Sequence, residues 1–149
     1  MTAKEKALQL LDRRDYSRAE LLRKLAEKDF DEAEAAEAVE RLAELGFVDD
    51  ARYAPILVRH YAAKGYGPQR VRQELQKRGI PKELWDEAME QMPQQDDAVD
   101  RLLRSRLKSL PPDRDELRRA SAFLQRKGYG WDEIRAAIER YNSEIEEEN

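Results

Sequence analysis

The 149-residue chain contains no cysteine and a single histidine, His60. Without cysteine it cannot form a disulfide framework, a thiolate metal site or a cysteine nucleophile. A two-histidine zinc site cannot be built, and a Ser-His-Asp triad would have to use His60. Valine, isoleucine and threonine together number 11, too few for the strands of a sandwich, barrel or doubly wound sheet. These shortages exclude a β-rich fold and argue against zinc or thiol chemistry.

Long apolar runs are also missing. The first six residues lack the apolar segment of a signal peptide, and no stretch approaches the roughly 18 apolar residues of a membrane span. We therefore expect a soluble, cytoplasmic protein. Only 7% of the residues are aromatic and 40% are charged, which is little material for one large core. Small modules joined in a row fit this composition better.

Helix-forming residues dominate what is there. Alanine, glutamate, arginine, leucine and lysine occupy more than half of the chain. Apolar periodicity and helix-ending signals predict nine helices, near residues 3–14, 17–28, 32–45, 51–64, 68–78, 82–92, 95–108, 113–127 and 131–145. We expect the acidic end, residues 144–149, to fray into solvent.

A pattern of about fifty residues recurs three times. The sequences LAEKDF at 25–30, LQKRGI at 75–80 and LQRKGY at 124–129 are separated by 50 and 49 residues. Each is followed in register by AVE, AME or AIE, and an apolar-periodic segment precedes each one. The repeat predicts three tandem three-helix modules, at 1–50, 51–94 and 95–149. Because a module of this size buries little alone, neighbours should stack into an elongated, curved, all-α rod.

Local signals mark the junctions between the predicted helices. Ser17 and Glu20 form a capping-box pattern at the start of the second helix. Further junction residues are a stop at Gly46, after which Phe47 and Val48 can pack back on the helix, an N-cap at Asp49 and Asp50, a stop at Gly65, and a start at Gly67 and Pro68. Gly79 and Gly128 are expected to end the middle helices of the second and third modules.

No pattern of catalytic residues stands out. The sequence GYGPQR at 65–70 lacks the third glycine and the lysine of a phosphate loop, so it indicates a turn between helices. Asp49 and Asp50 could form a carboxylate pair for acid–base work or magnesium, but capping explains both. His60 fits a surface or packing role better than that of a base. We therefore expect no enzyme activity, no cofactor and no metal.

The middle of the chain is strongly basic although the whole has a formal charge of −4. Residues 52–82 contain eight lysine or arginine residues and one acidic residue, Glu74. Lysine and arginine on a solvated helix normally alternate with acids, and these do not. Such a stripe can hold a polyanion or an acidic protein groove. The candidate contact residues are Arg52, Arg59, Lys64, Arg70, Arg72, Lys77 and Arg78.

Several stretches resemble the RecX family, the bacterial modulators of the RecA recombinase. The most specific are LGFVDDARYA at 45–54 and GYGPQRVRQELQKRGI at 65–80, with weaker support from residues 7–11 and 17–21. The resemblance covers residues 3 to about 142. One departure is Asp29, which stands where the family's first repeat often has glycine.

The resemblance implies a non-enzymatic negative regulator acting in homologous recombination, DNA repair and the SOS response. It implies binding to the RecA filament on single-stranded DNA, along its groove, with inhibition of recombinase, ATPase and co-protease activities. The protein itself is expected to be a monomer that does not bind membranes. Under this reading the basic residues form the contact surface and the junction residues shape the modules.

Two other readings remain open. Each module joins its second and third helices by a short turn, as in a helix-turn-helix DNA-binding module. The third helices are acidic where base reading needs donors, so this alternative is limited to weak, salt-sensitive DNA binding without sequence specificity. A helical scaffold that grips a peptide would instead show no dependence on DNA or nucleotide.

Overall fold

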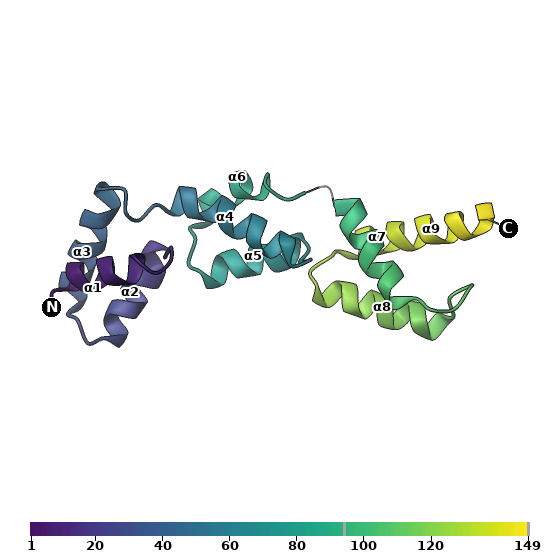
Figure 1. Ribbon diagram of the computed structural model, residues 1–149, viewed down its shortest axis with the longest axis horizontal. Coiled ribbons are helices and arrows are strands. Elements are labelled where there is room, and N and C mark those ends of the chain that lie inside the picture. The colour runs from purple at the N-terminus through teal and green to yellow at the C-terminus, as the bar shows by residue number, and fades with distance from the viewer. Residues whose placement is uncertain (94, 149) are drawn as a thin grey trace. The chain divides into compact units, whose positions relative to one another are not determined.

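The computed structural model describes residues 1–93 and 95–148, and in these ranges all regular structure is helical (Figure 1). The elements are α1(Ala3–Leu11), α2(Arg18–Glu27), α3(Glu32–Glu44), α4(Asp50–Ala63), α5(Pro68–Lys77), the 3₁₀ turn η1(Lys82–Leu84), α6(Trp85–Met89), α7(Gln95–Arg106), α8(Arg114–Arg126) and α9(Trp131–Glu148). Every predicted helix is present, and the all-α fold class is confirmed.

The chain forms two compact units whose division runs through α4 and α5. Unit 1 contains residues 1–58 and 74–90, and unit 2 contains residues 59–73 and 91–149 as far as they are described. The predicted module boundaries stay predictions, and residue 94, at one of them, lies outside the described residues.

In unit 1, α1 and α2 both pack on α3. Their apolar faces meet in a core that includes Leu21, Leu25, Val39 and Leu42. The capping box at the start of α2 is confirmed, because Ser17 Oγ accepts from the Glu20 amide at 3.0 Å and Glu20 Oε1 accepts from the Ser17 amide at 3.0 Å. Paired caps of this kind satisfy amides that the first turn of a helix leaves without partners.

In unit 2, α7 packs on α8 and α9, the green and yellow helices of Figure 1. Val99, Leu103, Leu124 and Ile134 are fully or almost fully buried in their shared core. At the start of α8, Asp113 accepts from the Glu116 amide at 2.8 Å and caps the helix. As at the start of α2, a side-chain oxygen at the N-cap accepts from the amide three residues further along.

One joint between successive repeats lies within unit 1. The turn after α5 sits on the N-terminus of α2, where Ser17 Oγ donates to the carbonyl of Arg78. Glu20 accepts from Arg78 at 3.2 Å and from Arg14 at 3.3 Å. A Cβ added to Gly79 would lie within 3.0 Å of Ala19 Cβ, so the two backbones approach closely. We call this contact the first joint.

The corresponding contact in the next repeat lies within unit 2. There the turn after α8 sits on the N-terminus of α5, and the Gly67 amide donates to the Lys127 carbonyl at 2.7 Å. The Gln69 amide donates to the Gly128 carbonyl at 3.1 Å. A Cβ on Gly128 would lie within 3.0 Å of backbone atoms of Arg70. We call this contact the second joint.

Three details correct the sequence-based expectations for the helix ends. The acidic end does not fray, because α9 continues to Glu148, and Asn149 lies outside the described residues. The predicted helix 82–92 is a 3₁₀ turn followed by a short α-helix that ends at Met89. The predicted helix 3–14 ends at Leu11.

Two further corrections concern the junction before α4. Of the two residues expected to pack back on the preceding helix, Val48 does so in the core of unit 1, whereas the Phe47 side chain is exposed. Asp49 alone caps α4, accepting from the Arg52 amide at 3.1 Å. Asp50 instead accepts from the Arg18 amide at 3.0 Å, at the N-terminus of α2. It therefore satisfies the first amide of a distant helix, whose N-cap is Ser17, and no sequence signal linked that helix to this residue.

The remaining junction residues lie where the sequence placed them. Gly46 and Gly65 have positive φ values after the ends of α3 and α4, as expected of helix stops. Pro68 begins α5, where its missing amide hydrogen is not needed. Gly67 has no positive φ, and its role is the close approach in the second joint.

Candidate interaction surfaces

The seven predicted basic contact residues divide between the two units. Arg52, Lys77 and Arg78 belong to unit 1, and the other four, Arg59, Lys64, Arg70 and Arg72, belong to unit 2. Five of the seven side chains are exposed; Arg70 and Arg78 are half-buried. Sequence proximity therefore does not make them equivalent.

Arg70 and Arg78 use their guanidinium groups within the fold. Arg78 donates to the buried carboxylate of Glu20 in the first joint. Arg70 lies 4.5 Å from the ring centroid of Tyr66 and donates to the Arg126 carbonyl at 3.3 Å in the second joint. Both side chains hold repeats together, which makes them poor candidates for contacts to another molecule.

The other five cations project into solvent with weak internal contacts. Arg59 donates to Gln91 at 3.1 Å, Lys77 lies 3.5 Å from Glu74, and Lys64 lies 5.6 Å from the Tyr61 ring. Arg52 and Arg72 have no carboxylate within 4.0 Å among the described residues. Exposed pairs of this kind contribute little to stability, so these cations remain available for contacts to an anionic partner.

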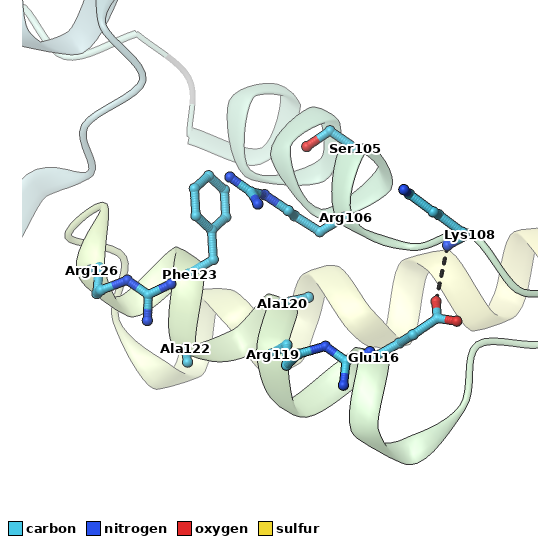
Figure 2. Close-up of a pocket in the computed structure, with 9 residues that line it drawn as sticks. All are labelled: Ser105, Arg106, Lys108, Glu116, Arg119, Ala120, Ala122, Phe123 and Arg126. Carbon is cyan, nitrogen blue, oxygen red and sulfur yellow. Dashed lines mark hydrogen bonds between the residues drawn. The ribbon is translucent and has the colours of Figure 1, made fainter.

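The structure adds a basic groove that the sequence reasoning missed. It lies between α7 and α8 within unit 2 and has a volume of about 780 Å³ (Figure 2). Four of its lining residues are cations, Arg106, Lys108, Arg119 and Arg126. The small side chains of Ala120 and Ala122 and the ring of Phe123 supply its apolar part.

Glu116, the acidic residue among the described lining residues of this groove, is engaged mainly by the loop before α8. Glu116 accepts from the Lys108 amide at 2.9 Å (Figure 2). It also accepts from the Ser109 amide at 3.3 Å and from the Ser109 hydroxyl. These hydrogen bonds, that from the Ser109 hydroxyl first, lower the pKa of Glu116 below its ordinary value. The carboxylate therefore stays ionised and hydrogen-bonded to the loop before α8, and its charge is also attracted to Arg119 without forming an ion pair within 4.0 Å.

The sequence hid this groove because acids on the same segment balance its charge. Residues 93–149 carry similar numbers of acidic and basic residues, so the segment shows no excess of positive charge. A usable signal was present on one helix face. Arg119 and Arg126 are seven residues apart on α8 and therefore share a face, with no acid between them.

No other feature of the described chain suggests chemistry. Among residues 1–93 and 95–148, no three histidine, cysteine or acidic side chains gather as metal ligands would. His60 is exposed beside the ring of Tyr61, and GYGPQR forms the turn between α4 and α5 as predicted. No helix in the described part is long and apolar enough to span a membrane.

Comparison with known proteins gives one consistent result. Three family models match the chain, described as the first, second and third three-helix domains of RecX, at residues 3–42, 49–89 and 94–138. A regulatory protein RecX from Trichlorobacter lovleyi is 42% identical, over 90% of this chain and 92% of its own length. Another from Halorhodospira halophila is 39% identical, over 90% and 84%.

A solved structure supports the same fold. The crystal structure of RecX from Lactobacillus salivarius superimposes with a TM-score of 0.83 and covers 94% of each chain. Its sequence identity of 23% makes this a likeness of fold alone.

Proposed function

Because the chain belongs to the RecX family of regulatory proteins, we propose that it is a non-enzymatic negative regulator of the RecA recombinase. It binds the RecA filament on single-stranded DNA along its groove and lowers recombinase, ATPase and co-protease activities. The observation that carries this proposal is the ordered match of all three three-helix domains, together with close relatives named as regulatory proteins over most of their length.

The exposed cations supply a physical basis for filament contacts. In unit 1 these are Arg52 and Lys77, and in unit 2 they are Arg59, Lys64 and Arg72. Their charges increase the rate of encounter with an anionic partner and strengthen the complex without being needed for folding. We leave out Arg70 and Arg78 because their side chains stabilise the joints.

The test is inhibition of ATP hydrolysis by RecA assembled on single-stranded DNA. We expect the wild-type protein to inhibit at amounts equal to or below those of RecA. A variant with Arg52→Glu, Arg59→Glu and Arg72→Glu should inhibit about tenfold or more weakly, with an unchanged melting midpoint. Failure of the wild-type protein to inhibit would overturn the proposed function.

A matched control separates specific contacts from a general change in charge. Arg13, Arg23 and Lys28 are exposed in the first three helices and their junctions, outside the basic middle. Changing all three to glutamate alters the net charge by the same amount and should leave inhibition near the wild-type level. If both triple variants lose inhibition equally, or if neither does, the assignment of these contact residues is wrong.

A further inference from the structure

The α7–α8 groove differs from the rest of unit 2 in how its cations are used. Arg104 on α7 pairs with Glu144 at 2.9 Å, Arg140 on α9 pairs with Asp100 at 2.7 Å, and Arg118 on α8 pairs with Asp115 at 3.2 Å. The charges of these arginines are neutralised by carboxylates of the same unit. Unit 2 therefore pairs other arginines of its helices with nearby carboxylates.

The four groove cations form no close ion pair among the described residues, although Arg119 is attracted to Glu116 at longer range. Within the described residues, no carboxylate lies within 4.0 Å of the charged groups of Arg106, Lys108, Arg119 or Arg126. All four are exposed, and all four line one depression between two helices. Four like charges held together repel one another, so this arrangement favours the binding of an anion.

The groove shape favours an extended anion. Arg119 and Arg126 stand two turns apart on α8, about 10.5 Å along its axis, so a single small anion would not reach both guanidinium groups. Arg106 and Lys108 come from the opposite wall, at the end of α7 and just beyond it (Figure 2). Cations on both walls suit a chain of regularly spaced negative groups lying between them.

The groove chemistry favours phosphates over the carboxylates of a protein partner. A protein interface usually centres on a buried apolar anchor, and here the only large apolar side chain is Phe123. Arg106 already covers that ring, with its guanidinium carbon 3.7 Å from the ring centroid. Three of the four cations are arginines, whose planar donors fit phosphate oxygens in pairs as well as they fit carboxylates, so the lack of an apolar anchor is what favours a phosphate chain.

We infer that the α7–α8 groove binds the phosphodiester backbone of a nucleic acid strand. Arg119 and Arg126 contact phosphates from one wall, and Lys108 contacts them from the other. Arg106 stays on Phe123 and shapes the groove. No base edge is read, so binding is independent of sequence and depends strongly on salt. This site belongs to the third module and is separate from the exposed cations proposed above to contact the filament.

The test measures binding of the full-length protein to a fluorescent oligothymidylate, with no RecA present, at several salt concentrations. We expect Arg119→Gln with Arg126→Gln to weaken binding about tenfold at low salt. The slope of log affinity against log salt should become shallower by about 1.4, because each phosphate contact to a single strand contributes about 0.7. Unchanged affinity and slope would overturn the inference.

The matched control changes Arg114 and Arg118 to glutamine. Both lie on α8, both are exposed, neither lines the groove, and the net charge changes by the same amount. We expect this variant to bind as the wild-type protein does, with the same helicity. Equal losses in the two variants would mean a diffuse charge effect and would contradict a built site.

Two competitors identify the ligand class. Unlabelled single-stranded or duplex DNA should displace the labelled strand, and the relative amounts needed show which form of the backbone fits better. Polyglutamate of similar charge should compete at least tenfold less well. If polyglutamate competes better than DNA, the groove recognises protein carboxylates and the inference is wrong. Because RecA is absent, failure here leaves the proposed regulatory function untouched.

Discussion

The two joints bring the same elements together with different chemistry. In the first joint a side-chain hydroxyl, from Ser17, meets the carbonyl at the end of α5; in the second a backbone amide, from Gly67, meets the carbonyl at the end of α8. The first also contains Glu20, buried at 7% exposure between two arginines. The second has an arginine, Arg70, at the corresponding position of its helix.

This difference shows that the repeat preserves a backbone path rather than a set of side chains. A Cβ on Gly67 would lie within 3.0 Å of Gly128 and Tyr129 backbone atoms, so the second joint has no room for the serine of the first. The turn of the first repeat carries Asp29 at φ +66, although Gly79 and Gly128 occupy the corresponding turns. Asp29 is exposed, unlike the closely approached Gly79 and Gly128. Glycine is therefore required where a turn docks, more than by the left-handed conformation itself.

The largest effect is expected from filling the joints. Gly128→Ala should lower the free energy of unfolding by about 2–4 kcal/mol, because it adds steric overlap with the Arg70 backbone to left-handed strain. Gly46→Ala is the matched control: Gly46 has φ +84 but open space around its Cβ position, and should cost about 1 kcal/mol. Chemical denaturation measures both. Equal costs would show that docking adds nothing to the need for glycine.

A rescue experiment distinguishes the two joints. At Gly79 the obstructing atom is Ala19 Cβ, so Ala19→Gly should recover part of the loss caused by Gly79→Ala, with a coupling of about 1–2 kcal/mol. At Gly128 the obstructing atoms include the Arg70 amide nitrogen and Cα, so no side-chain truncation at Arg70 should restore stability fully. If the effects of Ala19→Gly and Gly79→Ala on the free energy of unfolding were additive, the close contact in the first joint would be contradicted.

A smaller effect is expected from removing the charged partner of each joint. Glu20→Ala should cost about 2–3 kcal/mol, because it removes a buried carboxylate that accepts from both the Arg78 guanidinium and the Ser17 amide. Arg70→Ala should cost less, about 1 kcal/mol, because its half-buried side chain donates a long 3.3 Å hydrogen bond to a backbone carbonyl and contacts the ring of the half-buried Tyr66. Thermal melting of the two variants gives the comparison. A larger loss from Arg70→Ala would reverse our ranking of the joints.

The smallest effect concerns Asp50, which supports the first joint by accepting from the first amide of α2. Burial raises the pKa of Asp50 above 3.8, and the folded state therefore binds its proton more tightly than the unfolded state does. The stability that Asp50 contributes consequently falls as pH rises from 3.8 through the raised value. Asp50→Asn keeps an acceptor for the Arg18 amide without the buried charge, so its stability relative to the wild type should increase between about pH 3 and about pH 7.

Asp50→Ala is the comparison for that experiment. It removes the acceptor and should cost about 1 kcal/mol at neutral pH. Urea denaturation at the two pH values measures both variants. If Asp50→Asn is as unstable as Asp50→Ala at neutral pH, the charge of Asp50 stabilises the fold and the expected sign is wrong.

Helix positions and the charge of the middle segment could be predicted from the sequence. The contacts that each cation makes in the folded protein could not. The seven basic residues form one group in the sequence. In the structure, however, Arg78 donates a hydrogen bond to Glu20, 58 positions away, and Arg70 donates one to the carbonyl of Arg126, 56 positions away. The same limit applies to Asp50, which satisfies an amide 32 positions away. Nothing in the local pattern distinguishes these residues from their exposed neighbours.

The amino-acid sequence by itself determined the helical class, the threefold repeat and nearly all helix ends. Capping, glycine stops and apolar periodicity depend on residues only a few positions apart, so they can be recognised in the amino-acid sequence alone. Only the tertiary structure decided which arginines hold the joints, why Gly67 and Gly128 must lack side chains, and that four exposed cations line one groove. These features depend on contacts between segments far apart in the chain, and such contacts exist only after the helices have packed.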